Sequence, residues 1–252
     1  MKHLPRLLQP FATRRLDMAR EGLNWLRPLA MYGDAALSGR PATFTLGGVR
    51  HRYLWHPYMT TWRSERAVEL PVAWSRVRRV DPANRLEVGN VLSNYFRARH
   101  AVVDKYEQTP GVINEDIVDF DPGRRYELIV SVSTLEHVGW DEDEPRDPEK
   151  VLRAIERLRE LLTPSGELLF TVPHGWHTDL DGYLAEGRVP LAERWCLKRI
   201  TADGRWSEVG CDQLEGVAYD APFRYANGVT VAVVRGAKSS SRSAMKSAAR
   251  WA

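Results

Sequence analysis

From about residue 85 onward, short apolar runs alternate with segments that favour helices. Parallel strands need a long crossover connection, usually a helix, so this alternation predicts a mostly parallel sheet with crossover helices. The clearest of these helices is expected over 149–162, where apolar residues form one face. The predicted strands are Arg85–Val88, Ala101–Val103, Gly111–Ile113, Leu128–Val132, Glu167–Val172 and an antiparallel closing pair, Trp195–Ile200 and Val229–Val234.

The first 82 residues are predicted to form a helical and hairpin extension with a lid-like segment. Apolar residues at helical spacing over Pro10–Arg27 predict a basic amphipathic helix that ends at Pro28. Two β-prone runs flank the glycines at 47 and 48, which predicts a hairpin. A further helix over Glu65–Val80 is expected to be kinked or split at Pro71.

Charge is distributed unevenly along the chain. The formal net charge is +3, but residues 1–40 and 237–252 each carry +4, which leaves −5 for the middle. A uniformly basic nucleic-acid binder is therefore excluded, and we expect no DNA partner. The basic termini are suited to a membrane-surface or protein contact, and 237–252 is expected to be a flexible tail beyond a main domain of 83–236.

The cysteine content and hydropathy favour a cytoplasmic protein. Cys196 and Cys211 are the only cysteines, and two thiols form neither a disulfide framework nor a four-ligand zinc site, so a reducing compartment is expected. The sequence contains no run of eighteen apolar residues, which is the length that a membrane span requires. Prolines and an arginine pair interrupt any cleaved signal near the start. The oligomeric state is left open.

Polar segments follow four of the predicted strands, at the edge where a doubly wound sheet binds ligands. They are LEVGNVLS (86–93), VDK (103–105), INEDI (113–117) and SVSTLEHV (131–138), and LLTPSGELLFTVP (161–173) follows. Together, in this order, they resemble the class I S-adenosylmethionine-dependent methyltransferases, in the small-molecule, methyltransferase type 11-like branch. The resemblance covers about residues 83–175. It implies a doubly wound, mostly parallel seven-stranded Rossmann-like sheet, S-adenosyl-L-methionine as cofactor and a small-molecule acceptor.

The resemblance also assigns roles to the strand-end residues. Glu87 would lie at the methionine end of the cofactor, Asp104 would accept from the ribose hydroxyls, and Asp116 would border the adenine. Taken singly, such an aspartate is more often a turn or cap residue. The implied cofactor-binding residues are Glu87, Gly89, Asn90, Asp104, Lys105, Glu115, Asp116, Ile117 and Ser133.

The glycine loop departs from the family pattern of acidic-x-Gly-x-Gly-x-Gly. Only Gly89 remains, and Asn90 can replace one glycine because asparagine tolerates left-handed backbone geometry. Leu92 and Ser93 are expected to place side chains where the backbone would approach a ligand. The loop either follows another path or binds nothing, so a non-catalytic binding module is an alternative function.

The predicted activity is methylation of a small polar acceptor, as O-methylation of a sugar or metabolite hydroxyl. His137 is the first candidate for a general base and His174 the second, although Glu136-His137 is also typical of a structural turn. Glu65, Arg66 and Trp140 are candidate substrate or lid residues. RNA methylation is a further alternative, because both ends of the chain are basic.

The segment after the fifth strand also suits a metal. His174, His177 and Asp179 supply imidazole and carboxylate ligands that zinc or iron accept. Short loop spacing does not make such ligands converge, so no metal is expected.

Overall fold

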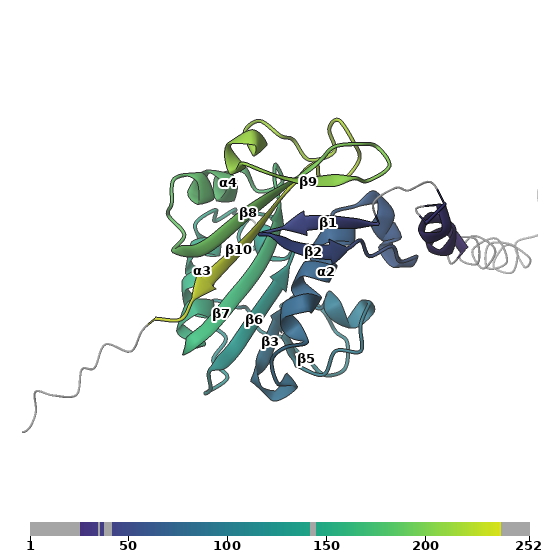
Figure 1. The fold of residues 1–252 in the computed structure, drawn as a ribbon. Helices are drawn as coiled ribbons and strands as arrows, with labels where there is room; N and C mark the ends of the chain where they lie inside the picture. The colour runs from purple at the N-terminus through teal and green to yellow at the C-terminus, as the bar shows by residue number, and fades with distance from the viewer. Residues whose placement is uncertain (1–25, 35, 38–41, 142–144, 238–252) are drawn as a thin grey trace, which may run out of the picture.

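The computed structural model describes residues 26–34, 36–37, 42–141 and 145–237 (Figure 1). Most of the predicted helix over Pro10–Arg27, and the basic tail after residue 237, lie outside the described residues. Residues 26–34 are helical, so the expected end at Pro28 is wrong. A proline removes one hydrogen bond from a helix without necessarily ending it.

The central sheet has eight strands in the order β5-β4-β3-β6-β7-β10-β8-β9. The strands from β5 to β7 pair in parallel, and β10 is antiparallel to both β7 and β8. The predicted doubly wound, mostly parallel sheet is therefore confirmed, with β9 as an eighth strand that we did not predict. The bounds are β3 (Arg85–Val88), β4 (Ala101–Val103), β5 (Val112–Ile113), β6 (Tyr126–Val132), β7 (Leu162–Pro173), β8 (Leu191–Arg199), β9 (Trp206–Val209) and β10 (Gly228–Arg235).

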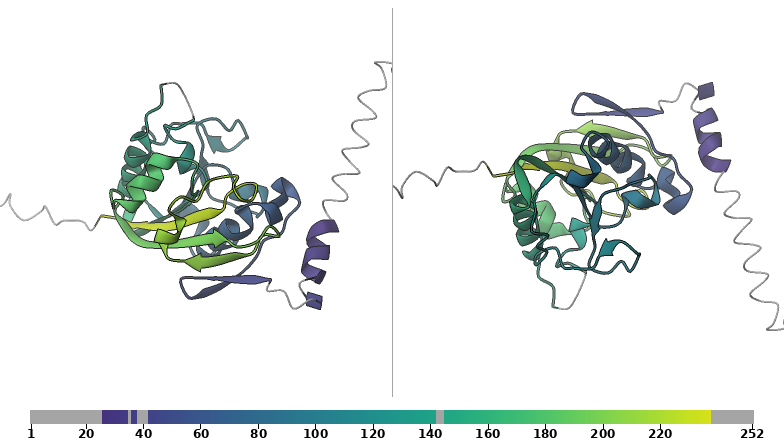
Figure 2. Two further views of the ribbon diagram at one scale, coloured as in Figure 1. Left: turned by 90° about the horizontal axis from the view of Figure 1, so that it is seen from above. Right: turned by 90° about the horizontal axis from the view of Figure 1, so that it is seen from below.

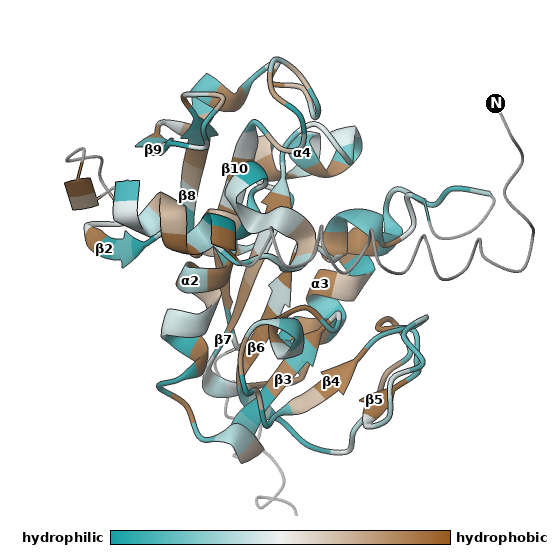
Figure 3. Cartoon of the chain, turned by 90° about the vertical axis from the view of Figure 1, so that its right-hand side faces the viewer, coloured by the Kyte–Doolittle hydropathy of each residue, from teal (hydrophilic) through white to brown (hydrophobic). Residues whose placement is uncertain are grey.

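Two hydrophobic cores cover the two faces of the sheet. Side chains of a strand alternate between its faces, so Leu128 and Val130 of β6 pack with helix α2 (Arg66–Val77). Ile129, between them, packs with α3 (Lys150–Glu160) and α4 (Thr178–Ala185). Figure 2 shows these helices on opposite sides of the sheet, and Figure 3 shows the mostly hydrophobic central strands between them.

The hairpin predicted around the two glycines is confirmed as β1 (Thr43–Leu46) and β2 (Val49–Arg52). Gly47 and Gly48 have φ angles of 57° and 75°, which glycine adopts without a steric penalty. The hairpin packs by its apolar side on α2 and the sheet.

Helix α2 continues through Pro71, so the predicted split is wrong. Proline has no N–H to donate to the carbonyl four residues earlier, which belongs to Ala67. That carbonyl instead accepts a hydrogen bond from the N–H of Leu54 at 3.0 Å. A contact with the segment after β2 thus replaces the missing helical bond.

The connections between the first strands are turns rather than the expected helices. The described 3-10 helices are η1 (Tyr58–Arg63), η2 (Pro82–Asn84), η3 (Leu92–Asn94), η4 (Leu135–His137) and η5 (Cys211–Leu214). Of these, η3 follows β3 and η4 follows β6, so both lie at the carboxyl edge of the sheet.

In the described part of the chain no helix has the length and apolar character needed to cross a bilayer.

The two cysteines form a disulfide, which corrects the expectation of two free thiols. It joins Cys196 of β8 to Cys211 of η5 across 15 residues, with 5.2 Å between the Cα atoms. The β8–β9 hairpin lies between them and brings the two residues together. The expectation of a reducing compartment therefore loses the observation on which it rested.

Candidate functional site

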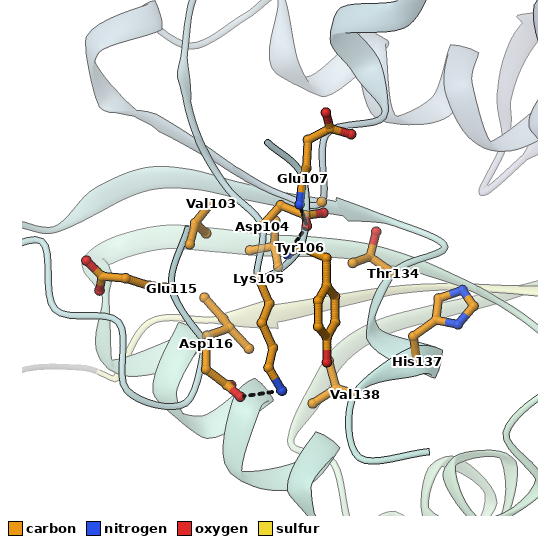
Figure 4. A pocket seen from close by; sticks show the side chains of 13 residues that line it. Val103, Asp104, Lys105, Tyr106, Glu107, Glu115, Asp116, Thr134, His137 and Val138 are labelled. Atoms are coloured by element: carbon orange, nitrogen blue, oxygen red, sulfur yellow. Dashed lines mark hydrogen bonds and ion pairs between the residues drawn. The ribbon is translucent and has the colours of Figure 1, made fainter. Parts of the chain in front are cut away.

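A cavity of about 360 Å³, here called the strand-end pocket, opens beyond the carboxyl ends of β3, β4 and β6 (Figure 4). Ligands of open α/β sheets bind at this edge. The lining residues are Val88, Gly89, Val103, Asp104, Lys105, Tyr106, Glu107, Glu115, Asp116, Ile117, Thr134, His137 and Val138. Seven predicted site residues are among them, drawn from four separate segments of the sequence.

Asp104 lies directly after β4 and shapes the loop that follows. Its Oδ1 accepts hydrogen bonds from the N–H groups of Tyr106 and Glu107, both at 2.8 Å. The aspartate therefore caps a turn and lines the pocket at once. In Figure 4 the ring of Tyr106 lies between Lys105 and His137, so this turn carries an aromatic ring into the pocket.

Asp116 is held between two lysines. Its Oδ2 lies 2.7 Å from Nζ of Lys150. The same oxygen lies 3.3 Å from Nζ of Lys105, the pair drawn in Figure 4. Burial raises its pKa, but the hydrogen bond from Lys150 and the charges around it outweigh burial, so the pKa of Asp116 is lowered. Its neighbours differ, because Glu115 is exposed whereas Ile117 is buried and forms apolar lining.

Gly89 is required by its surroundings as well as by its backbone. Its φ angle is 84°, and a Cβ atom there would lie 2.2 Å from Oγ1 of Thr134. Real Cβ atoms do not approach so closely, so only glycine fits between β3 and the loop after β6. Gly89 therefore lines the strand-end pocket with backbone atoms alone.

The rest of the glycine loop differs from what the sequence predicts. Asn90 does not have a positive φ angle, so it does not replace a glycine by left-handed geometry. Leu92 is fully buried in the core beside α2, and Ser93 is exposed and donates to Asn90 Oδ1. The side chains of Asn90, Leu92 and Ser93 all lie outside the lining of the strand-end pocket.

Glu87 causes this different path. It is fully buried beneath the loop, where its Oε1 accepts from the N–H groups of Val91 and Leu92 at 2.9 and 2.7 Å. Its Oε2 lies 2.6 Å from Nε2 of His100. Glu87 thus holds the loop in a tight turn and does not itself line the strand-end pocket.

A second cavity of about 310 Å³, here called the acidic pocket, adjoins the first. His137 lines both cavities, and the consecutive residues Ser133 and Thr134 line the acidic and the strand-end pocket respectively. The segment after β6 is therefore the wall between them. The acidic pocket is lined by Met59, Thr60, Ser64, Glu65, Arg66, Ser133, Glu136, His137, Pro173, Trp176, Tyr219 and Tyr225.

Backbone strain is concentrated around the acidic pocket. In the described residues, five non-glycine residues have positive φ angles, and all but Asp220 line this pocket: Met59, Thr60, Ser133 and Tyr225. Such conformations cost about 1–3 kcal/mol each and cluster at functional sites. The surrounding fold therefore holds this pocket in a defined shape.

Three glutamates and one arginine lie close together at the acidic pocket. Glu65 and Glu136 line the pocket, and Glu69 lies behind Ser133, whose Oγ donates to Glu69 Oε1 at 2.6 Å. The Arg66 guanidinium donates to Glu69 Oε2 at 2.8 Å. Burial raises the pKa of Glu65 and raises that of Glu136 well above its ordinary value.

His137 is oriented by an aspartate. Its Nδ1 lies 3.0 Å from Asp141 Oδ1, and the Trp176 indole N–H donates to the other carboxylate oxygen at 3.2 Å. In a neutral imidazole this places the proton on Nδ1 and leaves Nε2 as an acceptor. The half-exposed ring can then take a proton from a ligand in either pocket and pass it to solvent.

Besides Glu87 and Asn90, the predicted residues His174 and Trp140 also lie outside both pockets. His174 Nδ1 lies 3.0 Å from Asp181 Oδ1, and Trp140 stacks on His177 with 4.4 Å between ring centroids. His177 in turn caps α4 by accepting from the N–H of Leu180. In the described residues no group of three histidine, cysteine or acidic side chains is placed to hold a metal ion.

Several lining residues were not found from the sequence. Tyr106 and Glu107 directly follow the predicted Asp104-Lys105 pair, so a longer strand-end segment would have included them. Tyr219 and Tyr225 come from the irregular segment before β10, where no sequence pattern indicates a site.

No family model matches this chain, and no curated protein matches it. Solved structures do match. The N-methyltransferase NodS from Bradyrhizobium japonicum WM9, in complex with S-adenosyl-l-homocysteine, is 16% identical, with 64% of this chain and 81% of that chain covered and a TM-score of 0.39. The sugar N-methyltransferase KedS8 from Streptoalloteichus sp ATCC 53650 is 14% identical, with 67% and 87% covered and a TM-score of 0.34.

A TehB-like SAM-dependent methyltransferase from Corynebacterium glutamicum ATCC 13032 is 16% identical, with 64% and 86% covered and a TM-score of 0.38. These likenesses concern the fold alone. The sheet order, with β10 and β9 running against the other six strands, is the doubly wound, mostly parallel Rossmann-like sheet that the sequence predicts. We base the function on the residues of the two pockets.

Proposed function

We propose that this chain is an S-adenosylmethionine-dependent methyltransferase that acts on a small polar acceptor. The observation that supports it most is the pair of adjoining cavities, which share His137 at the carboxyl edge of the sheet. A group-transfer enzyme needs two such sites, one for the donor and one for the acceptor, with the reacting groups meeting at the shared wall.

The strand-end pocket fits the cofactor in size and in chemistry. Its volume of about 360 Å³ lies in the range of small-molecule sites, about 300–1,000 Å³. Asp104 and Glu115 supply carboxylate acceptors suited to hydroxyl and amino groups, and Ile117 supplies apolar surface for a ring. When bound, the cofactor supplies a methyl group on a positively charged sulfur.

The chain's own residues divide the work of binding and proton transfer. Asp104 would hold the ribose hydroxyls, and the bare backbone at Gly89 would allow the methionine end to approach. His137, with Asp141 behind it at 3.0 Å, would take the proton that the acceptor releases. Each of these groups faces the strand-end pocket or its wall.

The altered glycine loop suggested a non-catalytic binding module instead. The structure weakens the reason for that alternative, because the Leu92 side chain lies in the core and leaves the strand-end pocket open. Replacing the missing glycines by larger residues thus changes the loop's path without filling the cavity.

Calorimetric titration with S-adenosylhomocysteine tests the proposal. We expect saturable binding to the wild type and at least about tenfold weaker binding to Asp104→Ala, since a hydrogen bond to a charged group contributes about 1.5–3 kcal/mol. Asp104→Asn, which keeps an acceptor for the turn, separates loss of the ligand contact from loss of the loop. Asp121→Ala, in an exposed turn, is the matched control. No heat at high micromolar ligand would overturn the proposal.

A further inference from the structure

We propose that the acidic pocket binds the acceptor as a protonated amine, so that the methylated atom is nitrogen rather than the oxygen of a hydroxyl. This inference rests on the proposed function and narrows it to one class of substrate. It follows from the charge, the unpaired oxygen and the aromatic lining of this cavity.

The charges of the acidic pocket do not balance. Arg66 is committed to Glu69, with 2.8 Å between Nη1 and Oε2, and Ser133 donates to the other oxygen of the same carboxylate. Glu65 accepts a backbone N–H from Ala226 at 3.3 Å, and the charges of Arg66 and of the buried Arg199, which does not line the cavity, also act on it. The described residues that line this cavity include no lysine and no second buried arginine. A cationic ligand would supply the charge that the protein lacks.

Glu136 provides the second observation. Its side chain lines the acidic pocket and is only 2% exposed, yet Oε2 has no hydrogen-bond partner among the described residues. A buried polar atom without a partner is destabilising, so such atoms are rare unless a ligand pairs with them. An ammonium group has three N–H donors and suits an uncompensated carboxylate better than a hydroxyl, which has one.

Aromatic rings complete the lining. Trp176, Tyr219 and Tyr225 line the same cavity as Glu65 and Glu136, and Trp176 meets Tyr219 edge to face with 4.8 Å between centroids. Aromatic faces attract organic cations and pack against their carbon skeletons. Carboxylates beside such rings form a site for an amine attached to an apolar or ring-shaped body.

The reaction then needs a proton acceptor, because an ammonium nitrogen has no free electron pair. The ammonium gives one proton to the Glu136 carboxylate, which yields a neutral amine and a carboxylic acid. Burial raises the pKa of Glu136, which favours this transfer in a site poor in water. The nitrogen pair then forms the bond to the methyl carbon, while the electron pair of the carbon–sulfur bond returns to sulfur.

His137 completes the proton path. Its Nε2 lies 3.9 Å from Glu136 Oε1, and the ring is 45% exposed. This distance is too long for a hydrogen bond, so a bridging water would carry a proton from Glu136 to the imidazole and on to solvent, which restores the carboxylate for the next acceptor. The remaining carboxylate, Glu65, stays as the partner of the methylated ammonium.

Binding of simple probes to the chain without cofactor tests the charge preference directly. We expect 2-phenylethylamine to bind, and 2-phenylethanol of the same skeleton to bind at least about tenfold more weakly, as judged by calorimetry at pH 7. Glu136→Gln should weaken amine binding about tenfold or more and leave S-adenosylhomocysteine binding unchanged. Glu156→Gln, an exposed carboxylate on α3, should change neither.

Methyl transfer to a mixed panel of small amines and alcohols, with product masses recorded, supplies the second readout. Methylated amines support the inference. Equal binding of the two probes, or methylation of alcohols alone, overturns it and leaves the methyltransferase intact. Absent binding of S-adenosylhomocysteine overturns the proposed function instead, while the probe titration still decides whether the acidic pocket prefers an amine.

Discussion

Glu87 and His100 form a fully buried pair beneath the loop after β3, with 2.6 Å between Oε2 and Nε2. The other oxygen of the same carboxylate accepts two backbone N–H groups of that loop. One side chain therefore joins the end of β3, the loop and the segment before β4. Its position explains how a loop short of glycines still turns sharply at the edge of the strand-end pocket.

Glu87→Ala is expected to destabilise the fold by about 3–5 kcal/mol, because removing one member of a buried pair leaves the other uncompensated. Glu87→Gln should cost less, since an amide oxygen can still accept from the loop. Urea unfolding measures both. Glu127→Ala, an exposed carboxylate bonded to Asn84, should change stability by less than about 0.5 kcal/mol. A Glu87→Ala protein as stable as the wild type would contradict the role assigned to this pair.

Gly89→Ala is expected to be more costly than Gly48→Ala, although both glycines have positive φ angles. A side chain at Gly48 meets nothing within 4 Å, whereas one at Gly89 meets Thr134 at 2.2 Å. Gly48→Ala therefore measures backbone strain alone, about 1–2 kcal/mol. The clash should add at least about 1 kcal/mol at Gly89. Equal losses in urea unfolding would show that the loop moves away from Thr134 freely.

The sequence predicts the central strands well because parallel strands are buried on both faces. β4 has the predicted bounds, Ala101–Val103, and is an uninterrupted apolar run, which is the signal of such a strand. β3 also has the predicted bounds, Arg85–Val88, although Arg85 and Glu87 interrupt its apolar residues and are themselves buried. β9 (Trp206–Val209) carries no such run. It forms because it pairs with β8 and contacts β1, which are relationships that local pattern does not contain.

The two pockets also differ in how far they could be predicted from the sequence. The strand-end pocket could be predicted because parallel topology places the carboxyl ends of β3, β4 and β6 at one edge, whatever their spacing in the sequence. The acidic pocket could be predicted only in part. Glu65, Arg66 and Ser133 were candidate residues, but Tyr219 and Tyr225 reach them through tertiary contacts such as the hydrogen bond from Ala226 to Glu65.

The Cys196–Cys211 disulfide is expected to stabilise the edge of the sheet. A closed loop of about 15 residues restricts the unfolded chain by about 3 kcal/mol in the chain-entropy model. The wild type should lose about this much in urea unfolding when reductant is added, and the double variant Cys196→Ala/Cys211→Ala should not respond to reductant. Equal wild-type curves with and without reductant would contradict the prediction.

His137→Gln is expected to lower turnover about 10²-fold or more, the usual contribution of a general acid or base. The variant keeps a polar side chain at the wall, so binding of S-adenosylhomocysteine should change little. Asp141→Asn should lower turnover less and alter the pH profile, because the carboxylate at 3.0 Å orients the imidazole. Unchanged turnover in His137→Gln, measured with saturating substrates, would contradict the proton-transfer role assigned to His137.

Stability should depend on pH in a direction opposite to that of most carboxylates. Burial raises the pKa of both Glu65 and Glu136, so between the ordinary value near 4.5 and the raised value the folded state binds more protons than the unfolded state. The free energy of unfolding therefore falls as pH rises through this window. Protonated carboxyls are stable in the pocket, and ionised ones are not.

Glu136→Gln isolates this effect, because it removes one titrating group and keeps the shape of the side chain. Histidines whose pKa is lowered by burial, such as His177, contribute the opposite slope in both proteins and cancel in the difference. We expect the stability of the variant relative to the wild type to rise steadily from pH 5 to pH 8 in urea unfolding. Saturating 2-phenylethylamine should restore the stability of the wild type near pH 8, because its ammonium group pairs with the ionised Glu136. Parallel stability curves for the two proteins would show that Glu136 does not titrate within the folded acidic pocket.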